Sequence, residues 1–193
     1  PVQPVAPDTE RFVLAAVVIE GATIFDTVAF APYYKDLLAR EITLVDVEKI
    51  LARITKKYRD AGYILSRAVA RPQNLATGVV RIDVIEGYVD EIIYEGEDVP
   101  KDMLQSYTRR ISADRPLRLK TLERYILLIN DINGIKVDPR LRAIDEEQGR
   151  YALVLKTSHK PVDGLAFLNN RGTPAVGRLQ GWASAGVNGV LGW

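Results

Sequence analysis

Carboxylates and a single imidazole are the side chains of this chain with the greatest potential for chemistry. The carboxylates lie closest together in two clusters: Asp145, Glu146 and Glu147, and Glu95, Glu97 and Asp98. Such clusters can act as general acid and base or bind calcium, but neither has the Asp-x-Asp-x-Asp-Gly register of a calcium loop. Both occur where turns are expected, so we interpret them as solvated surface turns.

Nucleophilic and zinc chemistry would need histidine or cysteine. The sequence has one histidine, His159, and no cysteine, which removes thiolate nucleophiles, disulfides and zinc–thiolate sites. His159 follows a predicted strand beside Lys160 and Pro161, and we interpret it as a solvated residue of a connection. We therefore predict that the protein is not an enzyme and has no cofactor and no metal site.

Charge is balanced along the chain. There are 26 basic and 25 acidic residues in 193, for a formal charge of +1, and 47% of the residues are hydrophobic. This composition is typical of a globular protein with room for one or two small domains. Without a strong positive field or a ladder of aromatics, no nucleic acid is expected as a partner. No stretch reaches the roughly 18 apolar residues of a membrane helix.

The elements that would position any functional residue occur twice. Matching positions lie about 71 to 75 residues apart: Ile19-Glu20-Gly21 with Tyr94-Glu95-Gly96, Gly62-Tyr63-Ile64 with Gly134-Ile135-Lys136, and Gly78 with Gly149. Each copy has the pattern strand, helix, helix, strand, strand, and is too small to bury much core alone. We predict an α+β protein of two tandem βααββ domains, which favours a modular binding arm over a single catalytic cleft.

The first domain is predicted at 12–87. Strands are expected at 12–20, 64–71 and 79–86, and helices at 27–40 and 44–58. The second helix begins after Thr43, with Asp46 near its N-terminal dipole. Its apolar positions form one stripe at spacings of three and four residues: Leu44, Val47, Leu51, Ile54 and Tyr58.

Segments on either side of this domain have different compositions. Residues 1–11 contain three prolines and are predicted to be a linker. The second domain is predicted at 88–160, and the joint Glu86-Gly87 leaves no flexible linker between the two copies. In 161–193 small or apolar residues alternate with polar ones, a pattern of membrane-barrel strands. We predict the start of a truncated β-barrel there, and a soluble hairpin remains the alternative.

Three segments of the first copy resemble the first POTRA domain of the two-partner secretion transporters, the haemolysin-activator type of outer-membrane protein. These segments are Gly62-Tyr63-Ile64-Leu65-Ser66-Arg67-Ala68, Pro72-Gln73-Asn74-Leu75, and 78–87 with its Glu86-Gly87 end. Leu122 to Leu128, followed by Asn130-Asp131-Ile132-Asn133-Gly134-Ile135, is similar to the second POTRA domain. Asn169-Asn170-Arg171-Gly172 and Asn188-Gly189-Val190-Leu191-Gly192 resemble the first barrel strands.

The resemblance implies a location and a partner. The region would lie in the periplasm, at the outer membrane of a Gram-negative bacterium, as a fragment of a larger pore protein. It would bind an unfolded secreted exoprotein of the adhesin or haemolysin type, through the N-terminal secretion domain of that protein, and pass it to the pore. Contact with outer-membrane lipid would come from the rest of the barrel. No nucleotide or metal is implied.

An extended polypeptide can bind such a domain by adding a strand to an open sheet edge. We place this edge on the second strand of the first domain and the adjacent helix: Ile64, Leu65, Ser66, Arg67, Ala68, Val69, Ala70 and Arg71, with Leu51, Ile54 and Tyr58 lining the groove. Proline at Val69 would then remove a donor from the binding edge. Alternatively, Arg67 and Arg71 simply blunt this edge against pairing.

The matching strand of the second domain is the lesser candidate. It would offer Lys136, Val137, Asp138 and Leu141, but Pro139 lies inside it and removes one donor.

Two other functions would use the same domains. A machine that inserts outer-membrane proteins would receive barrel precursors, usually through more than two such units. A periplasmic scaffold or cell-division domain would share the fold but continue into a transmembrane helix.

Overall fold

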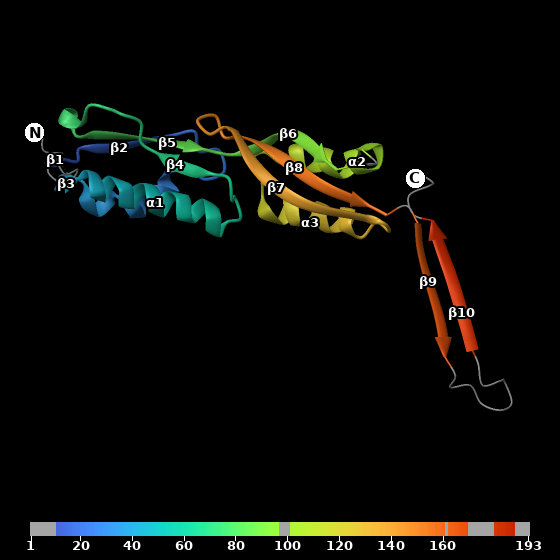
Figure 1. Cartoon of the computed structure of the whole chain (residues 1–193). Coiled ribbons are helices and arrows are strands. Elements are labelled where there is room, and N and C mark those ends of the chain that lie inside the picture. The colour runs from blue at the N-terminus through green and yellow to red at the C-terminus, as the bar shows by residue number, and fades with distance from the viewer. Residues whose placement is uncertain (1–10, 97–100, 161, 170–179, 188–193) are drawn as a thin grey trace, which may run out of the picture.

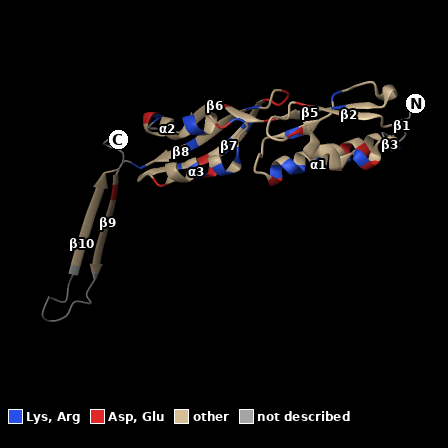
Figure 2. Cartoon of the chain, turned by 180° about the vertical axis from the view of Figure 1, so that it is seen from behind, with Lys and Arg blue, Asp and Glu red and all other residues tan. Residues whose placement is uncertain are grey.

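Two α+β units and a hairpin follow one another along an elongated molecule (Figure 1). The structure, a computed structural model, describes residues 11–96, 101–160, 162–169 and 180–187. Nearly all of the predicted linker at 1–11 lies outside these residues. Each unit has a three-stranded sheet with helices packed on it, which confirms the predicted α+β class. Charged residues of both signs are interspersed along the outer face of α1 (Figure 2).

The first sheet has the order β2-β5-β4, with β5 (Val79–Ile85) in the centre. Strand β2 (Ala16–Glu20) runs parallel to β5, whereas β4 (Arg67–Val69) is antiparallel to it. A short 3-10 turn, η3 (Leu75–Thr77), leads into β5. Helix α1 (Leu44–Asp60) packs on the sheet and shares a core with β5, formed mainly by Val47, Ile50, Ile54, Tyr58, Val80, Ile82 and Val84.

Two predicted elements at the start of this unit are wrong. The strand at 12–20 is broken at Leu14, whose N–H donates to Arg40 and whose carbonyl accepts from Ala39. The preceding residues form β1 (Arg11–Val13), which pairs with β3 (Glu41–Thr43) in a separate small sheet. The helix at 27–40 is replaced by two 3-10 turns, η1 (Thr27–Tyr33) and η2 (Lys35–Leu37), since Pro32 has no N–H for a regular helix.

Helix α1 begins at a capping box that uses aspartate instead of the usual glutamate. The Thr43 N–H and Oγ1 both donate to Asp46 Oδ2, each at 3.1 Å. Hydrogen bonds from Lys49 and then Thr43 hold the pKa of Asp46 below its ordinary value. Of the predicted stripe, Val47, Ile54 and Tyr58 are buried, whereas Leu44 and Leu51 are half-buried. Ile50, which was not predicted, is buried in the core.

The second unit contains all five predicted elements. They are β6 (Tyr88–Glu95), α2 (Lys101–Ser112), α3 (Leu119–Asn130), β7 (Ile135–Asp145) and β8 (Arg150–His159). The sheet order is β6-β8-β7, so β8 takes the central position that β5 has in the first unit. Helices α1 and α3 lie along the same side of the molecule in both ribbon views (Figures 1 and 2).

The end of the first unit, where the chain enters the joint, is fixed by the carboxylate of Glu86. It accepts hydrogen bonds from Tyr58 Oη at 2.7 Å, from the N–H groups of Thr23 and Ile24 at 2.8 and 3.1 Å, and from Thr23 Oγ1. Burial alone would raise the pKa of Glu86, but these donors hold it below its ordinary value. The pKa of Tyr58 is raised, first by burial and then by its bond to this carboxylate.

Direct contacts across the joint join the two units tightly. Two main-chain bonds cross it: Leu117 N–H to Gly87 O at 2.9 Å, and Leu119 N–H to Gly62 O at 2.8 Å. Arg67 binds the side chain and carbonyl of Glu146 at 2.8 and 2.9 Å. Little freedom is left for one unit to move against the other.

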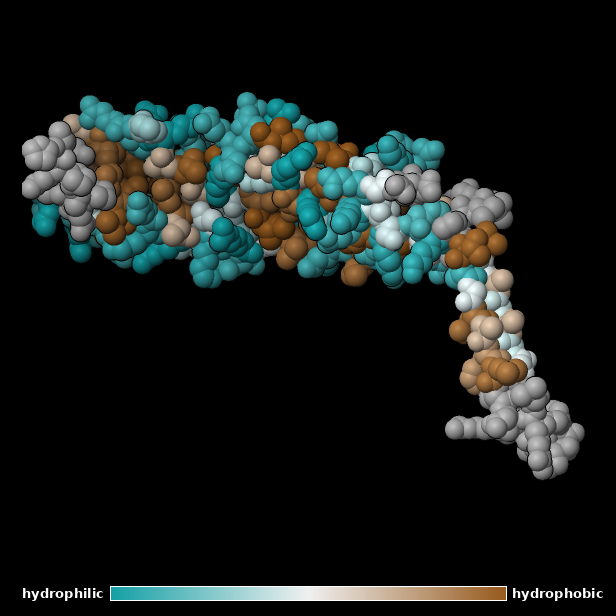
Figure 3. Space-filling model, in the orientation of Figure 1, coloured by the Kyte–Doolittle hydropathy of each residue, from teal (hydrophilic) through white to brown (hydrophobic). Residues whose placement is uncertain are grey.

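A hairpin of β9 (Val162–Asn169) and β10 (Gln180–Val187) stands apart from the two sheets (Figure 1). Phe167 and Trp182 face each other across it and are each 56% exposed, and Leu168 is 70% exposed. Figure 3 shows hydrophobic surface along the hairpin. Every helix among the described residues is too short or too polar to cross a bilayer.

Replacing Gly87 with alanine is expected to destabilise the protein. A Cβ at this position would lie 2.5 Å from Leu65 O and 2.6 Å from Leu65 Cβ, so the joint would have to open. Overpacking of this kind costs about 1–3 kcal/mol, measurable by urea unfolding. In the matched variant Gly164→Ala the new Cβ meets only Ser184 O, at 3.5 Å, and stability should not change. Equal stability of Gly87→Ala and wild type would contradict the tight joint.

The Glu86 carboxylate should also make stability depend on pH. Because its pKa is lowered on folding, its contribution is present above the ordinary pKa of 4.5 and is lost as the pH falls through the lower, folded value. Glu86→Gln should reduce the free energy of unfolding by about 2 kcal/mol at pH 7. The gap from wild type should narrow in urea melts below pH 4; a gap independent of pH would exclude this role.

Candidate functional site: the outer edge of β4

The outer edge of β4 can be assigned residue by residue from the strand register. In an antiparallel ladder, alternate residues bond the neighbouring strand and the others point away from it. The Ala68 N–H donates to a side chain of α1, so the main-chain N–H and carbonyl of Ala68 point outward, away from β5. The main-chain groups of Arg67 and Val69, which lie opposite Ile85 and Asp83, therefore point inward to β5. The prediction that Val69 offers a donor to a ligand is therefore wrong. The next residue, Ala70, lies just past the end of β4, and its N–H would face outward if the alternation continued.

Part of this outer edge is already occupied by the protein itself. Thr55 Oγ1 accepts from the Ala68 N–H at 3.0 Å, and Tyr63 O accepts from the Ser66 N–H at 3.2 Å. Strand alternation also directs the Ala68 carbonyl outward and, if continued one residue past β4, the Ala70 N–H. The edge can therefore accept a short stretch of extended chain and not a long strand.

Beyond β4, a side-chain amide takes the place of a strand residue. Gln73 Oε1 accepts from the Arg81 N–H at 2.8 Å, and Gln73 Nε2 donates to Arg81 O at 2.9 Å. Both main-chain groups of Arg81 that would face a longer β4 are thus satisfied. A ligand cannot pair with β5 there unless it displaces Gln73, so strand addition is confined to β4.

A groove of about 520 Å³ runs between α1 and β4. It is lined by Glu48, Leu51, Ala52, Thr55, Lys56, Arg59, Asp60 and Ala68. Leu51 and Ala68 are the predicted site residues that the structure brings together here. Ile54 and Tyr58, which were predicted to line the groove, are fully buried in the core, because they lie on the face of α1 that packs on the sheet.

The start of the predicted binding strand has another role. Ile64 and Leu65 form a turn and pack against the core of the second unit, so the strand begins only at Arg67. Ser66 is 2% exposed, and its Oγ is buried without a hydrogen-bond partner. These three residues are therefore not available at an edge, and the predicted strand at 64–71 is shortened at both ends.

The two arginines of this segment are both paired. Arg67 binds Glu146 of the second unit, and Arg71 binds Asp83 of β5 at 2.8 Å. Arg67 thus contributes to the joint. Arg71 lies just beyond β4, where its exposed guanidinium can limit further strand pairing.

The candidate edge on β7 is blunted more completely. Asn130 Oδ1 accepts from the Val137 N–H at 2.7 Å, and Asn130 Nδ2 donates to Val137 O at 3.3 Å. The main-chain groups of Val137 therefore point outward. By alternation so do those of Leu141 and of Pro139, which has no N–H. The main-chain groups of Lys136 and Asp138 point inward to β8. The Lys136 side chain donates to Asn130 O. Only the far half of β7, beyond Pro139, offers open main-chain groups.

Sequence reasoning missed the three residues that shape these edges, Thr55, Gln73 and Asn130. Gln73 belongs to the Pro-Gln-x-Leu motif and Asn130 ends a predicted helix, which are the signals that could have drawn attention to them. Thr55 gives no such signal, because its role depends on which residues of β4 point outward.

Among the described residues, those considered for chemistry form no reactive site; Glu97 and Asp98 lie outside the described residues. Residues 146–149 form a turn, as predicted, and Glu146 pairs with Arg67. His159 ends β8, and its Nε2 is buried without a hydrogen-bond partner, so the interpretation of a solvated His159 is wrong. Among the described residues, no group of three or more histidine or acidic side chains could hold a metal ion.

Comparison with known proteins finds a family model that matches part of the chain, and several relatives. The family model "POTRA domain, ShlB-type" matches residues 12–87. The heme/hemopexin transporter protein HuxB of Haemophilus influenzae (strain 86-028NP) is 25% identical over 162 residues, 82% of this chain and 28% of that protein. The outer membrane transporter CdiB of Escherichia coli is 26% identical over 180 residues, 93% of this chain and 29% of that protein. The chain thus spans less than a third of the length of these relatives.

Solved structures show the same fold. CdiB from Escherichia coli superposes with a TM-score of 0.74 at 25% identity, covering 100% of this chain and 36% of that one. The N-terminal domain of Omp85 from Thermosynechococcus elongatus gives a TM-score of 0.58 at 23% identity, over 77% of this chain and 66% of that one. The second likeness concerns the fold alone.

The cap on the β4 edge can be tested by hydrogen exchange. Thr55→Val removes the acceptor at nearly constant volume, so the Ala68 amide should exchange about fivefold faster, because it loses a hydrogen bond of about 1 kcal/mol. The Val69 amide, which points to β5, should keep its rate and serves as the internal control. Equal acceleration of both amides would mean that the whole strand has loosened, and no acceleration would mean that Thr55 does not cap the edge.

Proposed function

We propose that this chain is the periplasmic, polypeptide-binding region of a two-partner secretion transporter, because the family model "POTRA domain, ShlB-type" matches residues 12–87. The resemblance seen in the sequence agrees with the matches to the transporters HuxB and CdiB and with the likeness to the CdiB structure. In this role the chain is a binding module and not an enzyme. It would act at the outer membrane of a Gram-negative bacterium.

The ligand in this proposal is an unfolded secreted exoprotein, recognised through its N-terminal secretion domain and passed on to the pore. It binds by adding a short strand to β4 while its side chains enter the groove beside α1. The observation that carries this mechanism is the groove between α1 and β4, lined by Leu51 and Ala68. It lies beside an edge where strand alternation directs the Ala68 carbonyl and, one residue past the strand, the Ala70 N–H outward. Main-chain bonds of this kind are largely indifferent to the sequence of the ligand.

The binding is expected to be weak. Each main-chain hydrogen bond contributes about 1 kcal/mol net, whereas association costs about 4–15 kcal/mol. The few open groups of β4 cannot meet this cost, so most of the affinity must come from side chains in the groove. A weakly held polypeptide can be released to the pore, which suits a transfer step.

The hairpin fits the start of a β-barrel in this proposal. Residues on one face are small or aliphatic, with Val162 opposite Val187 and Leu168 opposite Gly181. The other face combines Phe167 and Trp182 with polar residues. Two strands with this much exposed hydrophobic surface suit a lipid-facing sheet better than a hairpin in water.

The two alternative functions receive less support. The likeness to Omp85 extends to the fold only, so it does not favour a machine that inserts barrel precursors. The match to CdiB covers the whole chain, hairpin included, which does not suit a scaffold or cell-division domain.

Strand addition can be tested with matched proline variants. Ala70→Pro removes the outward N–H of the β4 edge without breaking a bond to β5, and Ala143→Pro makes the same change on β7. The probe is a fluorescein-labelled, uncharged peptide of about twelve residues that alternates valine or threonine with serine, long enough to form one strand. Loss of one hydrogen bond should weaken its binding to Ala70→Pro about fivefold in fluorescence anisotropy.

Ala143→Pro should bind the peptide as wild type does. The reverse result would move the site to β7, and unchanged binding by both variants would reject strand addition at either edge. Circular dichroism should show that both variants remain folded.

A further inference from the structure

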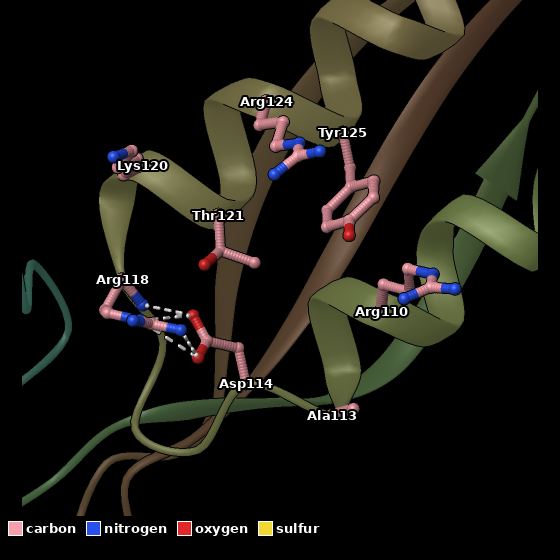
Figure 4. A pocket seen from close by; sticks show the side chains of 8 residues that line it. All are labelled: Arg110, Ala113, Asp114, Arg118, Lys120, Thr121, Arg124 and Tyr125. Atoms are coloured by element: carbon pink, nitrogen blue, oxygen red, sulfur yellow. Dashed lines mark hydrogen bonds and ion pairs between the residues drawn. The ribbon is translucent and has the colours of Figure 1, made fainter.

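A second hollow, separate from the β4 edge, lies between α2 and α3. This cleft, of about 400 Å³, is lined by Arg110 and Asp114 on one side and by Lys120, Arg124 and Tyr125 on the other. Figure 4 shows Arg110 and Arg124 on opposite helices, with the Tyr125 ring between them and Asp114, bound to Arg118, at one end.

The cleft contains more positive charge than its own acid can balance. Asp114 is bound by Arg118, whose Nε and Nη2 donate to its carboxylate at 2.8 to 3.2 Å, as does the Arg118 N–H. Burial would raise the pKa of Asp114, but its bonds to Arg118 and Thr121 hold it below the ordinary value. The single acid is therefore ionised and fully engaged with Arg118.

Three cations remain without a carboxylate partner. Within 11–96, 101–160, 162–169 and 180–187, no ion pair is made by Arg110, Lys120 or Arg124. Arg124 lies over the Tyr125 ring at 5.8 Å, which orders its guanidinium beside the cleft without neutralising it. In a chain with a formal charge of only +1, this concentration of unpaired positive charge marks an anion-binding surface.

The cleft adjoins the groove of the first unit. Arg59 and Asp60 at the end of that groove are followed by Gly62, whose carbonyl accepts from the Leu119 N–H. Leu119 lies between Arg118 and Lys120, which line the cleft. One extended chain that leaves the groove can therefore reach the cleft after a few residues.

We propose that the cleft between α2 and α3 binds an acidic stretch of the polypeptide whose neighbouring segment occupies the β4 groove. This inference rests on the proposed function and names a feature of its ligand: a short extended segment, then carboxylates within a few residues. Arg110, Lys120 and Arg124 bind these carboxylates, and Tyr125 packs against the intervening chain.

A lipid headgroup is a less suitable ligand because of where the cleft lies. The cleft is at the N-terminal end of α3, and the chain leaves for β9 near the other end, where the Lys160 N–H donates to Gly134 O. Twelve helical residues separate the two ends, a distance of about 18 Å. A membrane that holds the hairpin would meet the opposite end of this unit.

The test compares two double variants of the full chain that make the same change in charge. Arg110→Glu with Arg124→Glu reverses the cleft, and Lys101→Glu with Arg142→Glu reverses two exposed cations outside it. The probe is a fluorescein-labelled peptide that alternates glutamate with threonine, and an uncharged peptide of equal length is the reference. Reversal of the cleft should weaken binding of the acidic peptide about tenfold, and the control pair by less than about twofold.

Equal losses in the two double variants, or no preference of wild type for the acidic peptide, would overturn the proposal. So would binding of phosphatidylglycerol vesicles that is lost in the cleft variant while the acidic peptide does not bind. If the cleft variant fails to fold, wild-type affinity for the acidic peptide must still fall on raising NaCl from about 0.05 to 0.3 M, while that for the uncharged peptide stays constant.

The two proposals fail separately. Ala70→Pro tests strand addition with the uncharged peptide, and the charge reversals test the cleft with the acidic one. If Ala70→Pro binds the uncharged peptide as wild type does, the β4 site is rejected. If the cleft variant binds the acidic peptide as wild type does, the cleft is rejected.

Discussion

The hydrogen-bonded carboxylate of Glu86 is the interaction on which the rest of the structure depends. It joins the end of β5 to the loop after β2 and to Tyr58 of α1, so the helix, the central strand and the exit from the first unit are fixed together. The next residue, Gly87, packs directly on Leu65. The two units are joined directly, so Ile64 and Leu65, which could have extended the edge strand β4, pack against the core of the second unit instead.

The same economy of main-chain groups governs the sheet edges. Exposed edges invite pairing with other chains, and proteins commonly blunt them. Here the blunting is done by Thr55, Gln73 and Asn130, whose side chains bind the main chain where a neighbouring strand would. Open main-chain groups are left on a short part of β4, next to a groove, and on β7 beyond Pro139. The caps that prevent indiscriminate pairing thus also restrict where strand addition could occur.

Periodicity in the sequence was sufficient to predict the α+β class, the duplicated unit and most helices and strands, because each long element buries one regular face. It failed where tertiary contacts decide the local structure, as at Leu14, which divides a predicted strand, and at Leu65, which serves the joint. The candidate site was predicted only in part. Whether Val69 or Ala70 points outward depends on the register of the ladder with β5, and no local pattern encodes that register.

The rigid joint also bears on how a ligand could engage both units. In proteins whose domains are tethered by a flexible segment, the effective concentration of a second site falls as the tether lengthens. The bonds from Leu117 and Leu119 across this joint leave no tether to average over, so any two surfaces on the two units keep a constant separation. The two units would therefore favour bivalent ligands whose two recognition elements are separated by the same distance as the two surfaces. Ligands with another spacing would gain no avidity.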